Sequence, residues 1–205
     1  MTLHCATTNP GKLAEFRLAA ERFGGGRWRL EPLPGQARLP PCPETGATFE
    51  ENAIQKVLHY GAHSEGYLFA DDSGLAADGL GGAPGVYSSR FAGPRATDAA
   101  NNALLLERLK GAADRRARFV CVVALARAGR LMGTFAGTVE GELIEEPRGT
   151  AGFGYDPLFF VPSLRRTLAE VDASRKLEVS HRGLALAALF RFLNDATPSS
   201  TPASR

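Results

Sequence analysis

Two adjacent carboxylates, Asp71 and Asp72, are the residues of this chain most suited to chemistry. They directly follow the apolar run 67–70, which predicts a short buried strand that ends where the acids begin. Carboxylates at such a point need a cation, a proton or hydrogen bonds to offset their burial. Neighbouring side chains of a strand point to opposite faces, so we expect one acid to serve a site and the other to be structural. The simpler alternative is a strand that ends in an Asx turn.

Basic side chains lie at the starts of predicted helices, where a bound anion would stabilise them. Asn9 and Pro10 are a good N-cap and first helical residue, so Lys12 lies in the first turn of a predicted helix. The free N–H groups of such a turn bind phosphate, whereas a lysine there opposes the helix dipole unless it faces an anion. His181 and Arg182 open a second helix in the same way. The alternative for Lys12 is an ordinary surface lysine.

Further acidic and aromatic residues could complete a nucleotide site. Glu44 precedes a helix predicted from about residue 49 to about residue 64, and Lys56 lies on that helix. Asp72, with Glu44 as a helper, could hold Mg²⁺, which takes few protein carboxylates and keeps waters or substrate phosphates. Phe153 and Tyr155 lie among glycines, where they could stack on a planar base or form an aromatic core turn. Acids, cations and aromatics together suggest a nucleoside triphosphate with its metal.

Strands and helices must position these residues. The N-terminal residues 2–7 and the apolar stretch 118–125 predict strands, and 131–139 is a plausible antiparallel partner of the latter. Helices are expected after Asn9, after residue 97 or 98, and from about residue 181 to residue 194. The proline-rich residues 32–43 predict an exposed loop.

Composition narrows the classes of protein. The chain has 205 residues, 44% of them hydrophobic, which suits one domain or two lobes around a shared core. A net charge of +2 from 24 basic and 22 acidic residues argues against a general nucleic-acid or membrane-surface partner. Three scattered cysteines, no long apolar run and no secretory leader pattern predict a cytoplasmic location.

Six motifs give a resemblance to a known family. In order they are TTNPGK, ETGATFEENAIQK, ADDSGL, LGGAPGVYSSRFAG, GFGYDPLFF and SHRGLAL, and together they span roughly residues 3–193. This arrangement resembles the inosine triphosphate pyrophosphatases, the Ham1-like non-canonical purine nucleotide pyrophosphatases. The resemblance implies an α/β fold with an elongated mixed β-sheet flanked by helices, and two lobes with a central cleft. Residues 1–195 would form this single domain of two lobes, while the composition of residues 196–205 predicts a disordered tail.

The resemblance also implies an activity and a set of site residues. The reaction would be Mg²⁺-dependent cleavage of ITP, dITP and XTP to the monophosphate and pyrophosphate by a homodimer. The triphosphate would be held by Thr7, Thr8, Asn9, Pro10, Gly11 and Lys12, with phosphate or sugar contacts from Lys56 and Ser73. Magnesium would be bound by Glu44 and Asp72, and Asp72 would also accept the proton of the attacking water. The base would be bordered by Phe153, Gly154, Tyr155 and Asp156. The purine and its 6-oxo group would be read by Lys176, His181 and Arg182.

Two other functions fit the same residues. One is a catalytically silent nucleotide sensor, against which the intact set of Glu44, Asp72 and Lys12 argues. The other is a related pyrophosphatase for pyrimidine or modified nucleotides. The chain also departs from the family at Thr8, where glycine is usual.

Overall fold

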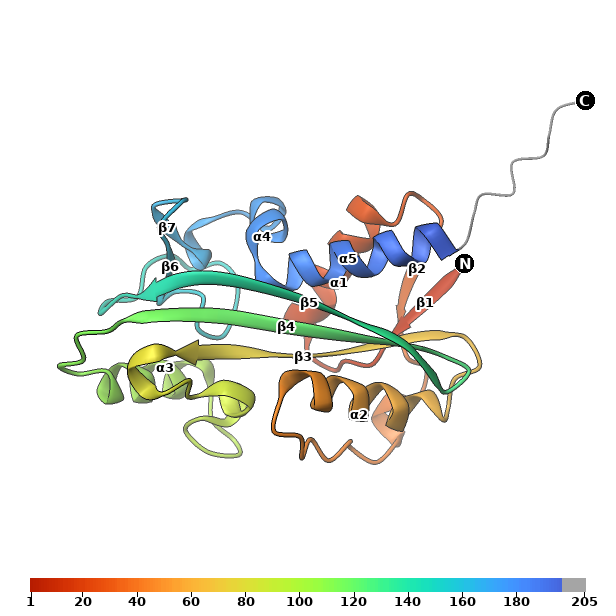
Figure 1. The fold of residues 1–205 in the computed structure, drawn as a ribbon, viewed down its shortest axis with the longest axis horizontal. Helices are drawn as coiled ribbons and strands as arrows, with labels where there is room; N and C mark the ends of the chain where they lie inside the picture. The colour runs from red at the N-terminus through yellow and green to blue at the C-terminus, as the bar shows by residue number, and fades with distance from the viewer. Residues whose placement is uncertain (197–205) are drawn as a thin grey trace, which may run out of the picture.

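One seven-stranded mixed sheet runs through the molecule (Figure 1) in the computed structural model, which describes residues 1–196. The strand order is β2-β1-β3-β4-β5-β6-β7. β1 pairs in parallel with β2 and β3, and all other neighbours are antiparallel. The strands are β1 (Thr2–Cys5), β2 (Arg29–Pro32), β3 (Tyr67–Ala77), β4 (Arg116–Arg127), β5 (Arg130–Leu143), β6 (Phe159–Val161) and β7 (Arg166–Thr167).

Helices cover both faces of this sheet (Figure 1). One face carries α1 (Pro10–Phe23), α4 (Ala173–Val179) and α5 (His181–Ala196). The other face carries α2 (Phe49–Gly61) and α3 (Asp98–Arg108). The expected α/β architecture, an elongated mixed sheet flanked by helices, is therefore confirmed.

Separate apolar clusters hold the helices to the sheet. Phe16 of α1 and Phe190 of α5 pack with Phe69 of β3 on one face. On the other face, Val57 of α2 belongs to one cluster and Leu105 of α3 to another. The helices α2 and α3 are therefore anchored in different clusters along the same sheet.

Local signals in the sequence account for the helix starts. The Asn9 side chain accepts a hydrogen bond from the Lys12 backbone N–H, with Pro10 at the first helical position. Thr48 and Glu51 form a capping box at the start of α2, the helix expected from about residue 49. Ser180 Oγ accepts from the Gly183 N–H at the start of α5.

Several predicted boundaries were wrong. The strand expected to stop at residue 70 continues through both acids to Ala77, because each carboxylate has hydrogen-bonding partners and β4 pairs with the whole strand. The helix that begins at Phe49 ends at Gly61, earlier than expected. The proline-rich loop contains a 3₁₀ turn, Gln36–Arg38.

The assignment of residues 1–195 to a single domain stays a prediction. Ala196, placed in the expected tail, is the last residue of α5, and residues 197–205 lie outside the described part of the chain. Within residues 1–196, no helix is both long and apolar enough to cross a bilayer.

Candidate functional site

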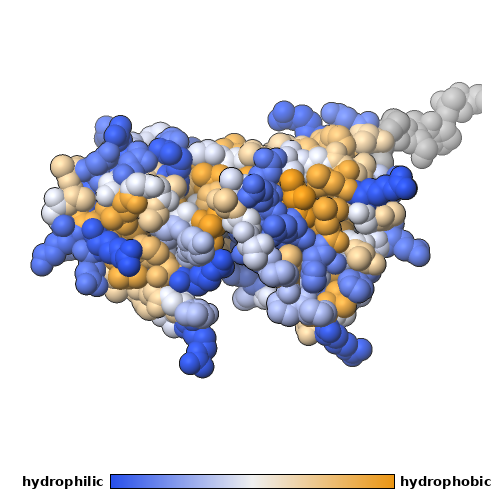
Figure 2. Space-filling model, turned by 60° about the horizontal axis from the view of Figure 1, so that its bottom comes forward, coloured by the Kyte–Doolittle hydropathy of each residue, from blue (hydrophilic) through white to orange (hydrophobic). Residues whose placement is uncertain are grey.

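A cavity of about 450 Å³ lies beside β3, and it is lined by residues of β3, α2 and α3, of the turn between β1 and α1, and of the segments 153–156 and 176–182. Figure 2, which brings the α2–α3 side forward, shows a notch in the surface there. All the predicted site residues line it except Pro10 and Gly11, which lie in the first turn of α1. The predicted residues in the lining are Thr7, Thr8, Asn9, Lys12, Glu44, Lys56, Asp72, Ser73, Phe153, Gly154, Tyr155, Asp156, Lys176, His181 and Arg182.

The turn between β1 and α1 forms one wall of the cavity. Thr7 Oγ1 accepts from the Asn9 N–H at 3.2 Å, and Asn9 Oδ1 accepts from the Lys12 N–H at 3.0 Å. The Lys12 ammonium extends to Asp71, 2.9 Å from Oδ2. A helix start with this turn and a lysine is chemically suited to phosphate. Gly11 does not line the cavity, but a Cβ there would lie 2.7 Å from the Phe153 ring, so the glycine lets this ring approach the turn.

Asp71 and Asp72 face opposite sides of β3, as alternation along a strand predicts. Asp71 lies against cations: Lys12 contacts it directly, and Arg182 Nε is 3.5 Å from its Oδ2. Burial alone would raise the pKa of Asp71, but Lys12 and Arg182 outweigh it and hold the pKa well below its usual range. Asp71 is therefore ionised at neutral pH and orders the cations around it.

Asp72 has a different environment and lines the cavity. Its Oδ2 accepts from Asn52 Nδ2 at 2.9 Å, and its Oδ1 accepts from the Ser73 N–H at 3.0 Å. Burial raises the pKa of Asp72, although Lys56 and the Asn52 hydrogen bond partly counter it. A carboxylate with a raised pKa is better matched to accepting a proton than an ordinary one.

Lys56 and Glu44 form an ion pair in the cavity wall, 2.8 Å from Nζ to Oε1. Lys56 Nζ also donates to the backbone carbonyl of Asp71 at 3.0 Å. Burial would lower the pKa of Lys56, but the Asp71 and Glu44 carboxylates outweigh it and raise the pKa. Lys56 thus stays charged beside the two candidate metal ligands, Glu44 and Asp72.

The donor chemistry of Glu44 and Asp72 fits Mg²⁺. Both carboxylates line one cavity, and Asp72 has no ion pair with any side chain of residues 1–196. In the same part of the chain, no group of three or more acidic, histidine or cysteine side chains could hold a metal by itself. Two carboxylates that leave places for phosphate oxygens and water are typical of a magnesium site that fills together with its nucleotide.

Another part of the cavity wall is a cluster of buried charges around Phe153. Lys176 Nζ lies 2.5 Å from Asp156 Oδ2 and 4.9 Å from the centre of the Phe153 ring. The Arg182 guanidinium lies 5.3 Å from the same ring and donates to Ser73 Oγ at 2.8 Å. The half-buried Phe153 is therefore held by cations and remains available to a planar base.

His181 and Tyr155 also line the cavity. The His181 ring stacks on Phe119 with centroids 4.6 Å apart, and its Nδ1 is buried without a hydrogen-bond partner within residues 1–196. Burial, followed by the charges of Arg182 and Lys176, lowers the pKa of His181 well below its usual value, so the imidazole is neutral. Tyr155 is buried in the apolar cluster that contains Leu105 of α3, and its hydroxyl donates to the Ser88 carbonyl at 2.7 Å.

This geometry agrees with the comparisons with known proteins. A sequence model of the Ham1 family matches residues 3–192. The chain belongs to the Ham1 family. A dITP/XTP pyrophosphatase of Exiguobacterium sp. strain AT1b is 50% identical over 186 residues, 91% of this chain and 93% of that protein. One of Thermus thermophilus is 46% identical over 97% of this chain and 94% of that protein.

Solved structures of Ham1 proteins share the fold. That of the Staphylococcus aureus Ham1 protein has a TM-score of 0.84 at 36% identity, covering 96% of this chain and 100% of that chain. A HAM1 protein from Coxiella burnetii has a TM-score of 0.83 at 42% identity, covering 95% and 99%.

Sequence reasoning missed several residues of this Ham1 site. Glu15 accepts from Lys176 at 2.7 Å and from Arg182 at 2.6 Å, so one carboxylate holds both cations. Asp98 accepts from the Gly154 N–H at 2.7 Å, and so links α3 to the Phe153 loop. Glu15 follows Lys12 by one helical turn, which was an available signal. Nothing in the sequence connects Asp98 to a loop 56 positions away.

Proposed function

We propose that this Ham1 protein hydrolyses ITP, dITP and XTP to the nucleoside monophosphate and pyrophosphate. The observation that carries the proposal is a single cavity lined by Asp72, by Lys12 and Lys56, and by Phe153 with its cations. The names of the curated relatives support the same reaction and the same class of substrate.

In the proposed reaction a water oxygen bonds to the α-phosphorus, and the bond from that phosphorus to the bridging oxygen breaks. Asp72 accepts the proton of the water as its oxygen attacks. Lys12 and Lys56 stabilise negative charge that develops on the phosphates. Mg²⁺, held by Glu44 and Asp72, would supply further neutralisation of the pyrophosphate leaving group.

Purine choice follows from the donors at the base end. Lys176 and Arg182 carry only donors, which suit the 6-oxo oxygen of hypoxanthine or xanthine. Adenine would present a 6-amino group to these donors, so donor would face donor and no hydrogen bond to the base would form, a mismatch that can be worth several powers of ten in kcat/KM. The guanine base also has a 6-oxo group, so its rejection must depend on contacts near its 2-amino position.

The test is hydrolysis of ITP, XTP, GTP, ATP and dTTP with Mg²⁺, with pyrophosphate and orthophosphate measured separately. We expect pyrophosphate with IMP or XMP, and slow reaction of ATP and GTP. Orthophosphate with a nucleoside diphosphate would mean attack at the γ-phosphorus and would overturn the proposal. Preference for dTTP would indicate a pyrimidine pyrophosphatase, and tight ITP binding without any product would indicate a sensor.

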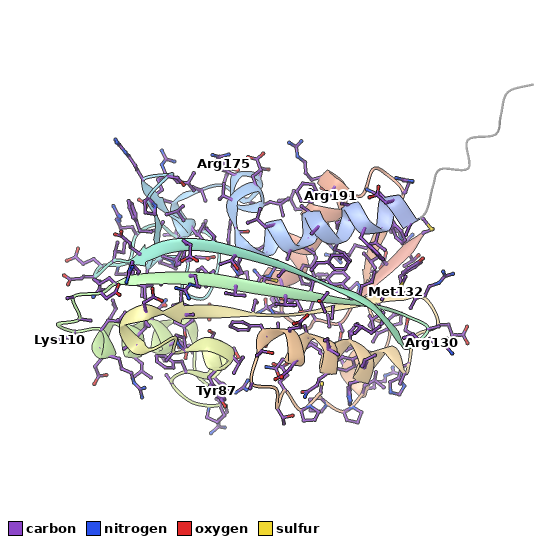
Figure 3. The ribbon with its side chains drawn as sticks, viewed as in Figure 1. Tyr87, Lys110, Arg130, Met132, Arg175 and Arg191 are labelled. Carbon is purple, nitrogen blue, oxygen red and sulfur yellow. The ribbon has the colours of Figure 1, made fainter. Side chains whose placement is uncertain are left out.

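We further propose that the protein is a cytoplasmic homodimer, as the resemblance implies. Apolar side chains are available on the surface: Tyr87 is 60% exposed and Met132 is 37% exposed (Figure 3). Light scattering of the protein as it elutes from a size-exclusion column should give twice the monomer mass of 21.8 kDa. A monomer mass across the micromolar range would contradict the dimer.

A further inference from the structure

The side chain of Asn52 joins two parts of the site that are separate in the sequence. Asn52 lies in the first turn of α2 and is fully buried. Its Nδ2 donates to Asp72 Oδ2 at 2.9 Å, while its Oδ1 accepts from the Gly46 N–H at 2.8 Å. One amide therefore bridges β3 to the loop that precedes α2, and both of its polar ends are used.

That loop carries the second candidate metal ligand, Glu44. Besides the Gly46 contact, the Thr45 N–H donates to Gln55 Oε1 at 3.2 Å, so side chains of α2 hold the loop at two successive residues. Gly46 is required for this approach, since a Cβ there would lie 2.8 Å from Asn52 Oδ1 and 2.6 Å from Glu51 Cβ. The position of Glu44 is thus set through α2.

Asp72 is fixed through the same helix. Its two oxygens each receive one N–H donor, from Ser73 and from Asn52, which together fix the plane of the carboxylate. Ser73 is the next residue of β3, so its hydrogen bond fixes the Asp72 carboxylate only relative to its own strand. The hydrogen bond from Asn52 fixes that carboxylate relative to the loop that carries Glu44.

We propose that Asn52 is a positioning residue that sets the relative placement of Glu44 and Asp72 for a divalent cation bound with the nucleoside triphosphate. This inference rests on the proposed function, because it assumes that these two carboxylates share a cation. Asn52 acts through the carboxylates and does not itself contact the metal. Outer hydrogen-bond partners of metal ligands change metal affinity or activity about 10- to 100-fold when they are removed.

Two variants test the inference, one at Asn52 and one at its loop partner Gly46. Asn52→Leu removes both hydrogen bonds, and Gly46→Ala pushes the loop away from Asn52 without altering either carboxylate. The matched control is Asn194→Leu. Asn194 also bridges two segments, accepting from Trp28 Nε1 at 3.2 Å and donating to the Phe23 carbonyl at 3.0 Å, but it does not line the cavity.

The measurement is Mn²⁺ binding, followed by the electron paramagnetic resonance of free Mn²⁺ in the presence of saturating α,β-methylene ITP. We expect Mn²⁺ affinity to fall about 10-fold or more in Asn52→Leu and Gly46→Ala, with IMP affinity in the absence of metal unchanged. Asn194→Leu should lower the melting temperature but leave Mn²⁺ affinity at the wild-type value.

The outcomes separate this inference from the proposed function. Wild-type Mn²⁺ affinity in a folded Asn52→Leu protein overturns the inference alone, provided that the wild-type protein releases pyrophosphate from ITP. If Asn52→Leu does not fold, unchanged Mn²⁺ affinity in Gly46→Ala overturns it. A wild-type protein that binds no Mn²⁺ with the nucleotide overturns both the inference and the metal-dependent function.

Discussion

Two neighbouring aspartates acquire opposite properties because the strand turns them to different sides. Asp71 faces Lys12 and Arg182, and its pKa is lowered. Asp72 faces a cavity and an amide, and burial raises its pKa. These environments support the proposal that Asp72 accepts the proton or binds the metal, and they leave Asp71 with the cations it orders.

Asp72→Asn should remove turnover without removing the fold. The substituted amide still offers an oxygen to Asn52 Nδ2, but its NH₂ then faces the Ser73 N–H, and it cannot accept a proton from water. We expect kcat for pyrophosphate release to fall by about 10²–10⁴-fold. The melting temperature should fall only by the effect of the one lost hydrogen bond, with the fold retained. The exposed Asp195→Asn is the control and should keep full activity. Near-normal turnover of Asp72→Asn would exclude Asp72 from the mechanism.

Asp71→Asn should instead cost stability, in a pH-dependent manner. Its lowered pKa means that Asp71 contributes stability above the unfolded pKa of about 3.9, and that this contribution is lost as the pH falls below that value. Removing one partner of a buried ion pair costs about 3–5 kcal/mol, which we expect at pH 7. At pH 3, the free energies of urea unfolding of Asp71→Asn and the wild type should differ by about 1 kcal/mol less than they do at pH 7. If the free energies of unfolding of Asp71→Asn and the wild type differed by the same amount at pH 7 and at pH 3, the lowered pKa of Asp71 would be contradicted.

At the scale of elements, close packing of α5 on β5 carries His181 and Arg182 into the wall of the cavity. Gly137 of β5 makes this possible, because a Cβ there would collide with the His181 carbonyl and lie 2.7 Å from the Ala185 backbone nitrogen. The start of α5 thus rests directly on the strand. The glycine is a geometric requirement of the site, although it is distant from the other site residues in the sequence.

Gly137→Ala should displace the start of α5. Overpacking of this kind costs about 1–3 kcal/mol, and the shift of His181 and Arg182 should raise KM for ITP. Gly133→Ala on the same strand is the matched control, since its Cβ would meet only the Phe135 ring at 3.8 Å. Melting curves and ITP kinetics of the two variants provide the comparison. Equal behaviour of both would show that α5 does not depend on the close approach.

Elements that rest on local chemistry could be predicted from the sequence, and those that rest on distant partners could not. The caps at Asn9, Thr48 and Ser180 were recognisable because their partners lie within three residues. The length of β3 was underestimated, because the cations that compensate Asp71 come from positions 59 and 111 residues away along the chain. Most of the residues that the family resemblance placed in the site line the cavity, but other lining residues, such as Tyr60 and Asn101, were not predicted. The ion pairs within the cavity, such as that of Lys56 with Glu44, were not predicted either.

At the scale of the whole molecule, the cavity is closely balanced in charge. Every predicted phosphate- or base-reading cation faces a protein carboxylate. The cations are Lys12, Lys56, Lys176 and Arg182, and the carboxylates around them are Glu15, Glu44, Asp71, Asp72 and Asp156. A triphosphate that arrives alone therefore meets as much negative as positive charge, although the cavity has several lysines.

Removal of divalent metal should consequently weaken binding of the nucleotide, and not only its hydrolysis. Two like unit charges about 4 Å apart repel by about 4 kcal/mol at an effective dielectric constant near 20. Without the metal, Asp72, which has no ion pair within residues 1–196, therefore opposes the phosphates, and Glu44 is offset only by Lys56. We expect EDTA to lower the affinity for α,β-methylene ITP by about 10-fold or more in calorimetry. IMP, with a single phosphate, should lose much less. Equal affinity of the triphosphate analogue with EDTA and with Mg²⁺ would mean that the lysines alone neutralise it, and that Glu44 and Asp72 do not meet the phosphates.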